Sequence, residues 1–382
     1  MESIHKVVTM KTLSIALGNT YPLYIGPNLL DSPLLRDFCS TLNKRLVIIT
    51  DNHLAPALGQ DLQSTLQAQG LTVDLLDFPG GEIHKTRETK QKLEDALLAK
   101  QYGRDTVLIA LGGGVVTDLA GFLAATYCRG LPVIYMPTTL LAMVDASIGG
   151  KTGVNTPHGK NLIGTFKQPV AVFMDTATLT TLPAREWRNG IVEIIKHSVI
   201  ADAGLFESLE QQVTQLQDPQ SPFLTEMIYA SCLIKKNIVE QDEYEQAIRQ
   251  VLNFGHTIGH AIETLDNYRI SHGEAVAMGM LVEGYLSMRC GFLEEGQVKR
   301  LHTLLKACGL PLKTSVFQDQ HALAEIMKLD KKAVKNSARF VLLDNLGQPH
   351  RHHGAYTMSV EPKHLYQALE WAQDNFGEYI TP

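Results

Sequence analysis

The residues TVLIALGGGVVTD, from Thr106 to Asp118, decide the fold class of this chain. The β-branched run Thr106–Ala110 predicts a buried strand, and the segment that opens at Gly114 predicts a helix. Three consecutive glycines, Gly112–Gly114, let the backbone approach a ligand closely, while a helix N-terminus offers N–H donors. The motif departs from the GxGxxG fingerprint. By itself it leaves open both a phosphate- or dinucleotide-binding turn and a plain strand-to-helix turn.

The residues on either side repeat the same alternation. Short apolar runs at Leu46–Thr50 and Leu131–Tyr135 predict strands, and apolar residues at three- and four-residue spacing predict helices at Gln60–Gly70 and Arg87–Lys100. Strands that alternate with helices favour a mostly parallel sheet covered by helices. Such sheets bind ligands at the carboxyl ends of their strands.

Beyond about Thr181 the pattern becomes helical. We place a domain boundary near Pro183, with residues 1–180 as an α/β domain and residues 181–382 as a mainly α-helical domain. The length of 382 residues agrees with two domains. Strand signals nearly vanish in the second part, apart from Phe340–Leu343. The helices expected there are Glu193–Ile200, Ala203–Gln215, Phe223–Val239, Val251–Leu265, Glu274–Cys290 and Gln297–Cys308.

Composition and charge limit the classes of function. Hydrophobic residues at 45% and charged residues at 19% describe an ordinary folded protein. The net charge of −6 (34 − 40) does not favour nucleic acid or an anionic membrane as a partner. Five cysteines, odd in number and without a CxxC pair, are typical of reduced thiols. No signal peptide or membrane span is recognisable, so we expect a cytoplasmic protein.

A second glycine-rich segment runs from Asp145 to Asn161. Its residues Gly149-Gly150-Lys151-Thr152 resemble the end of a P-loop, but Asp145 stands where the first glycine of that motif belongs, which argues against a Walker A site. We expect Lys151, Lys160 and Asn161 to lie on short glycine-hinged loops and to reach an anionic ligand. Solvated surface lysines are the alternative.

Three histidines within seventeen residues indicate a metal site. His256 and His260 stand four residues apart and therefore share one face of a helix, and His272 follows just beyond the next turn. Glu193 could supply a carboxylate. Its spacing from Lys196 equally fits a plain salt bridge within a helix.

Several cations lie near these elements in the sequence. In an acidic protein they suggest a substrate that bears phosphate or carboxylate, although a solvated helical face is the alternative for some of them. They are Lys196, Lys235, Lys236, Arg249, Lys331 and Lys332.

Together these motifs resemble the 3-dehydroquinate synthase family, over nearly the whole chain from about Thr12 to about Leu343. The resemblance implies an N-terminal NAD-binding α/β domain and a C-terminal helical, metal-binding domain. The stretches that carry it, in the family's order, are PGGEIHKTRETK (Pro79–Lys90), LGGGVVTDLAGFLAATYCRG (Leu111–Gly130), MPTTLLAMVDASIGGKTGVNTPHGKNLIGTF (Met136–Phe166), IRQVLNFGHTIGHAIE (Ile248–Glu263) and SHGEAVAMGM (Ser271–Met280).

The resemblance also implies roles for single residues. It assigns Zn²⁺, or Co²⁺, to Glu193, His256 and His272, which moves His260 from the metal to the substrate. It places the substrate against Arg129, Asp145, Lys151, Asn161, Lys196, Lys235, Arg249, Asn253 and His260, with one or both of Lys331 and Lys332. It places NAD⁺ against Asp51, Gly80, Gly81, Glu82, Ile83, His84, Lys85, Gly113, Gly114, Val115, Val116, Thr117, Asp118, Thr138, Thr139, Lys151, Lys160, Thr178, Leu179, Thr180 and Thr181.

The implied activity is a phosphate-eliminating lyase reaction of the shikimate pathway, which supplies chorismate and the aromatic amino acids. It converts 3-deoxy-D-arabino-heptulosonate 7-phosphate into 3-dehydroquinate and phosphate, and it regenerates NAD⁺ in each turnover. The resemblance further implies a homodimer. Another sugar phosphate cyclase, or a metal-dependent NAD polyol dehydrogenase of the same fold, is the alternative. Thr117 and His53 depart from the family's usual glycine and asparagine, and we expect both to shift NAD⁺ affinity without abolishing activity.

Overall fold

The computed structural model describes residues 10–329 and 337–377, and the chain divides into two compact units. The first unit comprises Met1–Leu182 and Pro219–Lys236, and the second comprises Pro183–Asp218 and Asn237–Pro382. Lys331 and Lys332 lie outside the described residues. In the part of the chain that the structure describes, no helix has the length and apolar character needed to cross a membrane.

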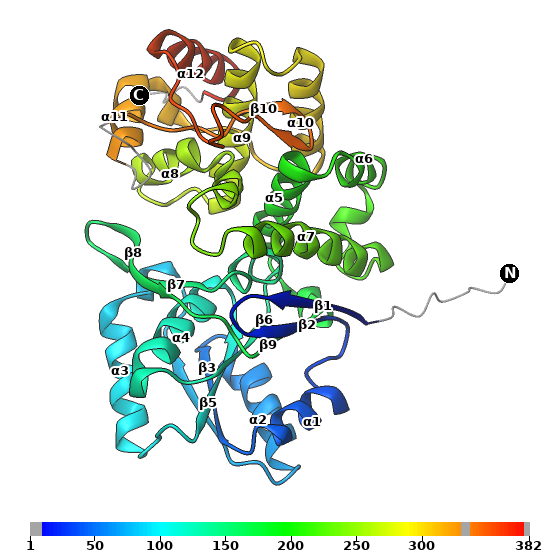
Figure 1. The fold of residues 1–382 in the computed structure, drawn as a ribbon, viewed down its shortest axis with the longest axis vertical. Helices are drawn as coiled ribbons and strands as arrows, with labels where there is room; N and C mark the ends of the chain where they lie inside the picture. Colours follow the sequence, from blue (N-terminus) through cyan, green and yellow to red (C-terminus); the bar gives the residue numbers. More distant parts are fainter. Residues whose placement is uncertain (1–9, 330–336, 378–382) are drawn as a thin grey trace, which may run out of the picture. The chain divides into compact units, whose positions relative to one another are not determined.

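The first unit is built on a seven-stranded sheet with the strand order β1-β2-β9-β6-β5-β3-β4 (Figure 1). Within this sheet β1 and β2 pair antiparallel, and the other neighbouring pairs are parallel. The inner strand β5 is buried along its whole length, as is typical of a parallel sheet covered on both faces. The prediction of an α/β architecture is confirmed. The strands are β1 (Lys11–Ala16), β2 (Thr20–Gly26), β3 (Arg45–Asp51), β4 (Val73–Phe78), β5 (Thr106–Gly112), β6 (Val133–Pro137) and β9 (Ala171–Asp175).

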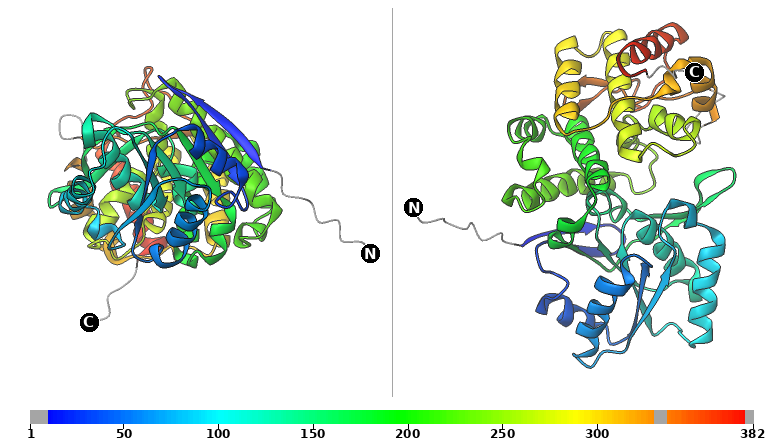
Figure 2. Two further views of the ribbon diagram at one scale, coloured as in Figure 1. Left: turned by 90° about the horizontal axis from the view of Figure 1, so that it is seen from below. Right: turned by 180° about the vertical axis from the view of Figure 1, so that it is seen from behind.

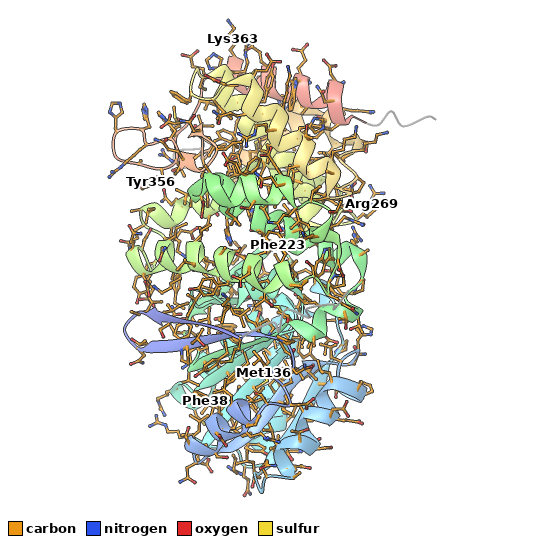
Figure 3. The ribbon with its side chains drawn as sticks, turned by 90° about the vertical axis from the view of Figure 1, so that its right-hand side faces the viewer. Phe38, Met136, Phe223, Arg269, Tyr356 and Lys363 are labelled. Carbon is orange, nitrogen blue, oxygen red and sulfur yellow. The ribbon has the colours of Figure 1, made fainter. Side chains whose placement is uncertain are left out.

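Helices cover both faces of this sheet (Figure 2). On one face α1 (Pro33–Thr41) and α2 (Gln60–Gln67) bury apolar side chains against Ile48, Ile109 and other inward-facing strand residues. Met136 of β6 belongs to this core, and Phe38 of α1 packs against it (Figure 3). The helices α3 (Arg87–Ala99) and α4 (Gly114–Thr126) lie on the other face, where α4 contacts β5 and β6.

Residues 151–166 form a two-stranded hairpin, which corrects the prediction of short glycine-hinged loops. Lys151 begins β7 (Lys151–Thr156), whereas Lys160 and Asn161 lie on β8 (Gly159–Phe166). The two strands pair antiparallel, and Gly153 faces Gly164 across them. A Cβ on Gly164 would lie 2.0 Å from the Thr152 carbonyl oxygen. The glycine therefore permits close strand pairing rather than a hinge.

The second unit is mainly helical, as the sequence predicts. The helix α9 is buried along most of its length, and α5, α8, α10 and α12 pack against it. The long helix α7 begins in the first unit and ends in the second. The elements are α5 (Ala184–Ala201), α6 (Ala203–Gln211), α7 (Pro222–Gln241), α8 (His256–Leu265), α9 (His272–Arg289), α10 (Glu295–Ala307), α11 (Gln320–Leu329), β10 (Leu343–Asn345), β11 (Gln348–Pro349) and α12 (Pro362–Phe376).

Two expectations for the second unit are wrong in detail. The helix predicted over Val251–Leu265 is broken, because a 3₁₀ segment at Ile248–Asn253 ends before Gly255, whose φ of 79° starts α8 afresh. The strand predicted over Phe340–Leu343 lies mostly further along the chain, at β10. Phe340 itself forms a single bridge with Met358.

Candidate active site

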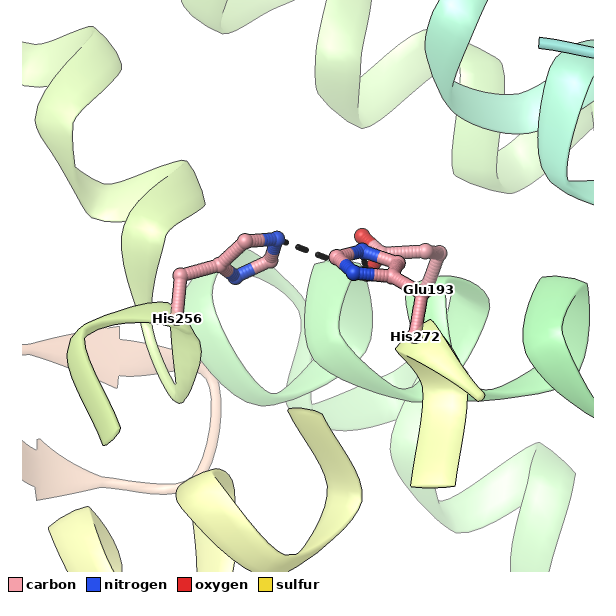
Figure 4. Close-up of side chains that lie close together, drawn as sticks. All are labelled: Glu193, His256 and His272. Carbon is pink, nitrogen blue, oxygen red and sulfur yellow. Dashed lines mark ion pairs between the residues drawn. The ribbon is translucent and has the colours of Figure 1, made fainter. Parts of the chain in front are cut away.

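Three side chains of the second unit converge from three helices: Glu193 of α5, His256 of α8 and His272 of α9 (Figure 4). The Nε2 atoms of both histidines lie 3.7 Å from Oε1 of Glu193. The potential ligand atoms of all three residues lie within 4.8 Å of one another, and Glu193 is fully buried. One carboxylate and two imidazoles are the donor set of a catalytic zinc site that keeps a coordination position open.

The local sequence explains where the two histidines lie. His256 is the first residue of α8, after Gly255 donates its backbone N–H to Oε2 of Glu283 at 2.9 Å. A Cβ on Gly255 would lie 2.5 Å from Cγ of Met280, so only glycine fits this turn. His272 is the first residue of α9, which begins with a capping box between Ser271 and Glu274.

The electrostatics of this cluster favour a cation. Burial alone would lower the pKa of His272, but the carboxylates of Glu263 and Glu193 outweigh it and raise that pKa to about 10. Two buried carboxylates therefore attract positive charge to this point. A divalent metal meets that demand, so the residues present fit the metal that the sequence implies.

Lys196 and His260 lie beside this trio. The Lys196 ammonium forms an ion pair with Glu193, and its side chain is almost completely buried. The His260 ring centroid lies 5.3 Å from that of His256 and 6.2 Å from that of His272. A second group of potential ligands, His260, Glu263 and His272, also meets the 4.8 Å limit.

Arg249 and Asn253 lie on the 3₁₀ segment that precedes α8. Arg249 is 2% exposed, and its guanidinium donates to the Glu243 carbonyl. Asn253 donates to Oε1 of Glu245 at 2.7 Å. The Asp242 carboxylate accepts the backbone N–H groups of Gln246, Ala247 and Arg249. Burial raises the pKa of Asp242, but these N–H donors outweigh it and hold that pKa below its ordinary value.

In the first unit, nearly all the residues predicted to contact NAD⁺ lie at or just after the carboxyl ends of parallel strands. The exceptions are Lys151 and Lys160, on the β7–β8 hairpin. Side chains gathered at this edge of a parallel sheet are typical of a nucleotide site. Asp51 ends β3, Gly80–Lys85 follow β4, Gly113–Asp118 follow β5, Thr138 and Thr139 follow β6, and Thr178–Thr181 follow β9.

Lys85 joins two of these segments. Its Nζ lies 2.5 Å from Oδ2 of Asp118 and 3.8 Å from Oε1 of Glu82, and the Lys85 side chain is 5% exposed. Burial would lower the pKa of Lys85, but these two carboxylates outweigh it and raise the pKa. Asn155 of β7 donates to Oε1 of Glu82 at 2.8 Å, which ties the hairpin to the same segment.

The two residues that depart from the family pattern, Thr117 and His53, make local contacts. Thr117 is buried, and its hydroxyl donates to the Gly114 carbonyl at 3.1 Å within α4. His53 lies so close to Gly80 that a Cβ there would meet His53 Cδ2 at 2.6 Å. The backbone N–H of Gly80 donates to Oδ1 of Asn52 at 2.9 Å. Sequence reasoning missed Asn52 and Asn155, because their partners lie far away in the chain.

Of the predicted substrate residues in the first unit, Lys235 and Asp145 form a close pair, and the other three are exposed. Lys235 of α7 lies 2.5 Å from both the Oδ1 and the carbonyl oxygen of Asp145. Arg129 and Lys151 are exposed. Asn161 has a left-handed φ of 54°, and its N–H donates to Oδ1 of Asn155 at 3.0 Å. The structure thus joins Lys235 with Asp145 and places Asn161 beside the segment that Lys85 ends.

Comparison with known proteins identifies the family of the chain. The family model described as 3-dehydroquinate synthase N-terminal matches residues 75–189, and the one described as 3-dehydroquinate synthase C-terminal matches residues 190–333. A 3-dehydroquinate synthase from Nitrosospira multiformis is 44% identical over 345 residues, which cover 90% of this chain and 93% of that protein.

Two solved structures share the fold over almost the full length of both chains. One is 2-deoxy-scyllo-inosose synthase complexed with carbaglucose-6-phosphate, NAD⁺ and Co²⁺, with a TM-score of 0.84, 26% identity, and coverage of 94% of this chain and 99% of that chain. The other is ValA, the 2-epi-5-epi-valiolone synthase of Streptomyces hygroscopicus subsp. jinggangensis, with NAD⁺ and Zn²⁺ bound. Its TM-score is 0.83, with 28% identity and coverage of 95% and 99%. The matches to the two family models and to the Nitrosospira enzyme show that the chain belongs to the 3-dehydroquinate synthase family.

Proposed function

We propose that this chain converts 3-deoxy-D-arabino-heptulosonate 7-phosphate into 3-dehydroquinate and phosphate, with NAD⁺ as cofactor and Zn²⁺ or Co²⁺ as metal. The observation that carries the proposal is the convergence of Glu193, His256 and His272, in a chain that belongs to the 3-dehydroquinate synthase family. Family membership favours this reaction over the two alternatives, a different sugar phosphate cyclase and a polyol dehydrogenase.

Glu193, His256 and His272 would hold the metal, which when bound supplies Lewis acidity toward a substrate hydroxyl. The His260 ring centroid lies 5.3 Å from that of His256 and 6.2 Å from that of His272, so His260 would contact the substrate beside the metal. Lys196, buried and paired with Glu193, would place a positive charge beside the same point. A buried ammonium suits an anionic substrate because a low-dielectric setting strengthens the attraction.

The residues at the carboxyl ends of the parallel strands would bind NAD⁺, which when bound accepts and returns a hydride. The α4 N-terminus at Gly113 and Gly114 offers backbone N–H donors, with no side-chain cap to occupy them. NAD⁺ in the structures of 2-deoxy-scyllo-inosose synthase and ValA supports the same cofactor here.

The substrate carries a phosphate and a carboxylate, and the cationic side chains would neutralise both. Lys235 and Arg249 are nearly buried, so they hold their charges in fixed positions. Charge-assisted hydrogen bonds from such groups bind oxyanions strongly. We assign the remaining substrate contacts to Arg129, Asp145, Lys151, Asn161, Asn253 and one or both of Lys331 and Lys332.

The test is to incubate the full chain with the heptulosonate phosphate, NAD⁺ and Zn²⁺, and to measure phosphate and dehydroquinate. We expect both products in equal amounts and no net NADH, because the cofactor is regenerated. Stoichiometric NADH without phosphate release would support a dehydrogenase and overturn the proposal.

A His256→Ala variant tests whether His256 is a metal ligand. Losing one of three ligands should remove tightly bound metal and activity together. Circular dichroism should show an intact fold. A variant that keeps both metal and activity would contradict the assignment of His256.

We also propose a homodimer and a cytoplasmic setting. The dimer rests on the family resemblance, and light scattering of the purified chain should give twice the chain mass of 42.2 kDa. The setting is supported by five free cysteines, three of them buried. Fractionation of cells that produce the tagged chain tests it, and recovery in a membrane or secreted fraction would contradict it.

A further inference from the structure

Glu263 is a buried carboxylate that none of the assigned roles uses. It lies on α8 and is 2% exposed. Its Oε2 lies 3.5 Å from Nδ1 of His272. The other ring nitrogen of His272, Nε2, faces Oε1 of Glu193 at 3.7 Å. The two nitrogens of this imidazole therefore face two different carboxylates.

A histidine that binds a metal through one nitrogen usually donates the N–H of the other to a fixed acceptor, which sets the tautomer and the ring orientation. His256 has such an acceptor, because its Nδ1 lies 3.2 Å from the Phe254 carbonyl oxygen. His272 has the Glu263 carboxylate in the equivalent place. The neutral carbonyl and the charged carboxylate would thus orient the two rings.

We propose that Glu263 is a positioning residue, which accepts the Nδ1–H of His272 and aims Nε2 at the metal. The inference rests on the proposed metal site. A charged acceptor also makes the imidazole a stronger donor to the metal than a neutral one does. His256 and Glu263 stand seven residues apart on α8, so two turns of one helix present a ligand and the support for another ligand.

A rival role for Glu263 is direct ligation. Glu263, His260 and His272 form the second group of potential ligands. In that arrangement His272 would bind through Nδ1 and Glu193 would be left without a metal. The variant Glu263→Gln distinguishes the two roles. A glutamine side-chain oxygen can still accept the hydrogen bond from His272, but it is a poor metal ligand.

The experiment compares Glu263→Gln, Glu263→Ala and the matched control Asp266→Asn. Asp266 is the carboxylate one turn further on, where Oδ2 accepts the Ile270 N–H at 2.9 Å and Oδ1 forms an ion pair with Arg269 at 3.1 Å. Each metal-free protein is titrated with Co²⁺ in competition with a chelator. The visible absorption of bound Co²⁺ reports its coordination, and thermal unfolding reports the fold.

We expect Glu263→Gln to bind one Co²⁺ about tenfold more weakly than the parent, and Glu263→Ala about 100-fold more weakly, each with a shifted Co²⁺ spectrum. Asp266→Asn should keep the parent affinity and spectrum. Parent-like affinity and spectrum in Glu263→Ala would overturn the proposal. Complete loss of binding in Glu263→Gln, with binding retained in His256→Ala, would overturn it in favour of direct ligation. If the parent chain binds no Co²⁺, the proposed metal site is wrong, and the role of Glu263 is overturned with it.

Discussion

At the scale of single residues, both units contain buried charges that are paired with an opposite charge, such as Lys85 with Asp118, Lys235 with Asp145 and Lys196 with Glu193. Lys85 and Asp118 form such a pair at 2.5 Å, with side-chain exposures of 5% and 17%. The attraction between two buried ions roughly offsets their lost hydration, but removing one partner leaves the other uncompensated. The pair thus fixes the segment after β4 against α4 and makes that junction sensitive to single substitutions.

Lys85→Met should destabilise the protein by about 3–5 kcal/mol, because it leaves the Asp118 carboxylate buried without its cation. The double variant Lys85→Met/Asp118→Leu should recover a large part of that loss. Urea unfolding of both variants measures the difference, and NAD⁺ titration should show weaker binding in both. Equal destabilisation in the two variants would mean that the pair is not coupled.

The metal ligands illustrate what the sequence can predict about single residues. Spacing alone groups His256 with His260, because residues four apart share one helix face. Which of them meets Glu193 depends on the packing of α5, α8 and α9, and local spacing does not report that packing. The family resemblance supplied the trio that the structure brings together. Glu263 is the last residue of one of the stretches that carry the resemblance, but the resemblance gives it no role. Neither spacing nor resemblance predicts which side chains a buried carboxylate faces.

At the scale of elements, the turn before α8 decides where the first histidine lies. The sequence predicts one helix over Val251–Leu265, because apolar periodicity continues through the break. Gly255 interrupts it with a φ of 79° and a contact to Met280 that excludes a side chain. Periodicity reports which face is apolar, but it does not report a left-handed residue inside the run.

Gly255→Ala should cost well over 1 kcal/mol, because it adds a clash with Met280 to the strain of a positive φ. Gly291→Ala is the matched control: Gly291 has a φ of 82°, and a Cβ there would meet nothing within 4 Å. The control should therefore show the strain alone, about 1 kcal/mol. Thermal unfolding measures both, and Co²⁺ titration should show weaker binding only for Gly255→Ala. Equal costs would contradict the steric role of Gly255.

Asp242 stabilises the turn that leads to Arg249, and this contribution depends on pH. Three backbone N–H groups hold the pKa of Asp242 in the folded state below its value in the unfolded state. The stabilisation is therefore complete above the unfolded pKa of about 4 and is lost as the pH falls through the folded pKa. Asp242→Asn should cost about 1–2 kcal/mol at pH 7. Urea unfolding should show that the cost shrinks below about pH 4. If the destabilisation by Asp242→Asn does not change with pH, the negative charge of Asp242 does not stabilise the turn.

At the scale of the whole molecule, the proposed cofactors divide between the two units. The metal ligands all belong to the second unit, and the residues assigned to NAD⁺ all belong to the first. The sequence predicts this division, because strand–helix alternation ends near Pro183 and the histidines come later. It could not predict that Pro219–Lys236 returns to the first unit, because an amphipathic helix such as α7 does not show which partner covers its apolar face.

The division predicts that each cofactor protects its own unit. A ligand that binds only the folded state stabilises it by about 2.7 kcal/mol at 100 times its dissociation constant, and the elements that hold it gain most. Zn²⁺ should slow amide hydrogen exchange in α5, α8 and α9, whereas NAD⁺ should slow it in the segments that follow β4 and β5. Mass spectrometry of peptides from the full chain measures both effects, and the His256→Ala variant should lose only the first. Protection by Zn²⁺ confined to the segments after the strands would mean that the metal binds elsewhere than Glu193, His256 and His272.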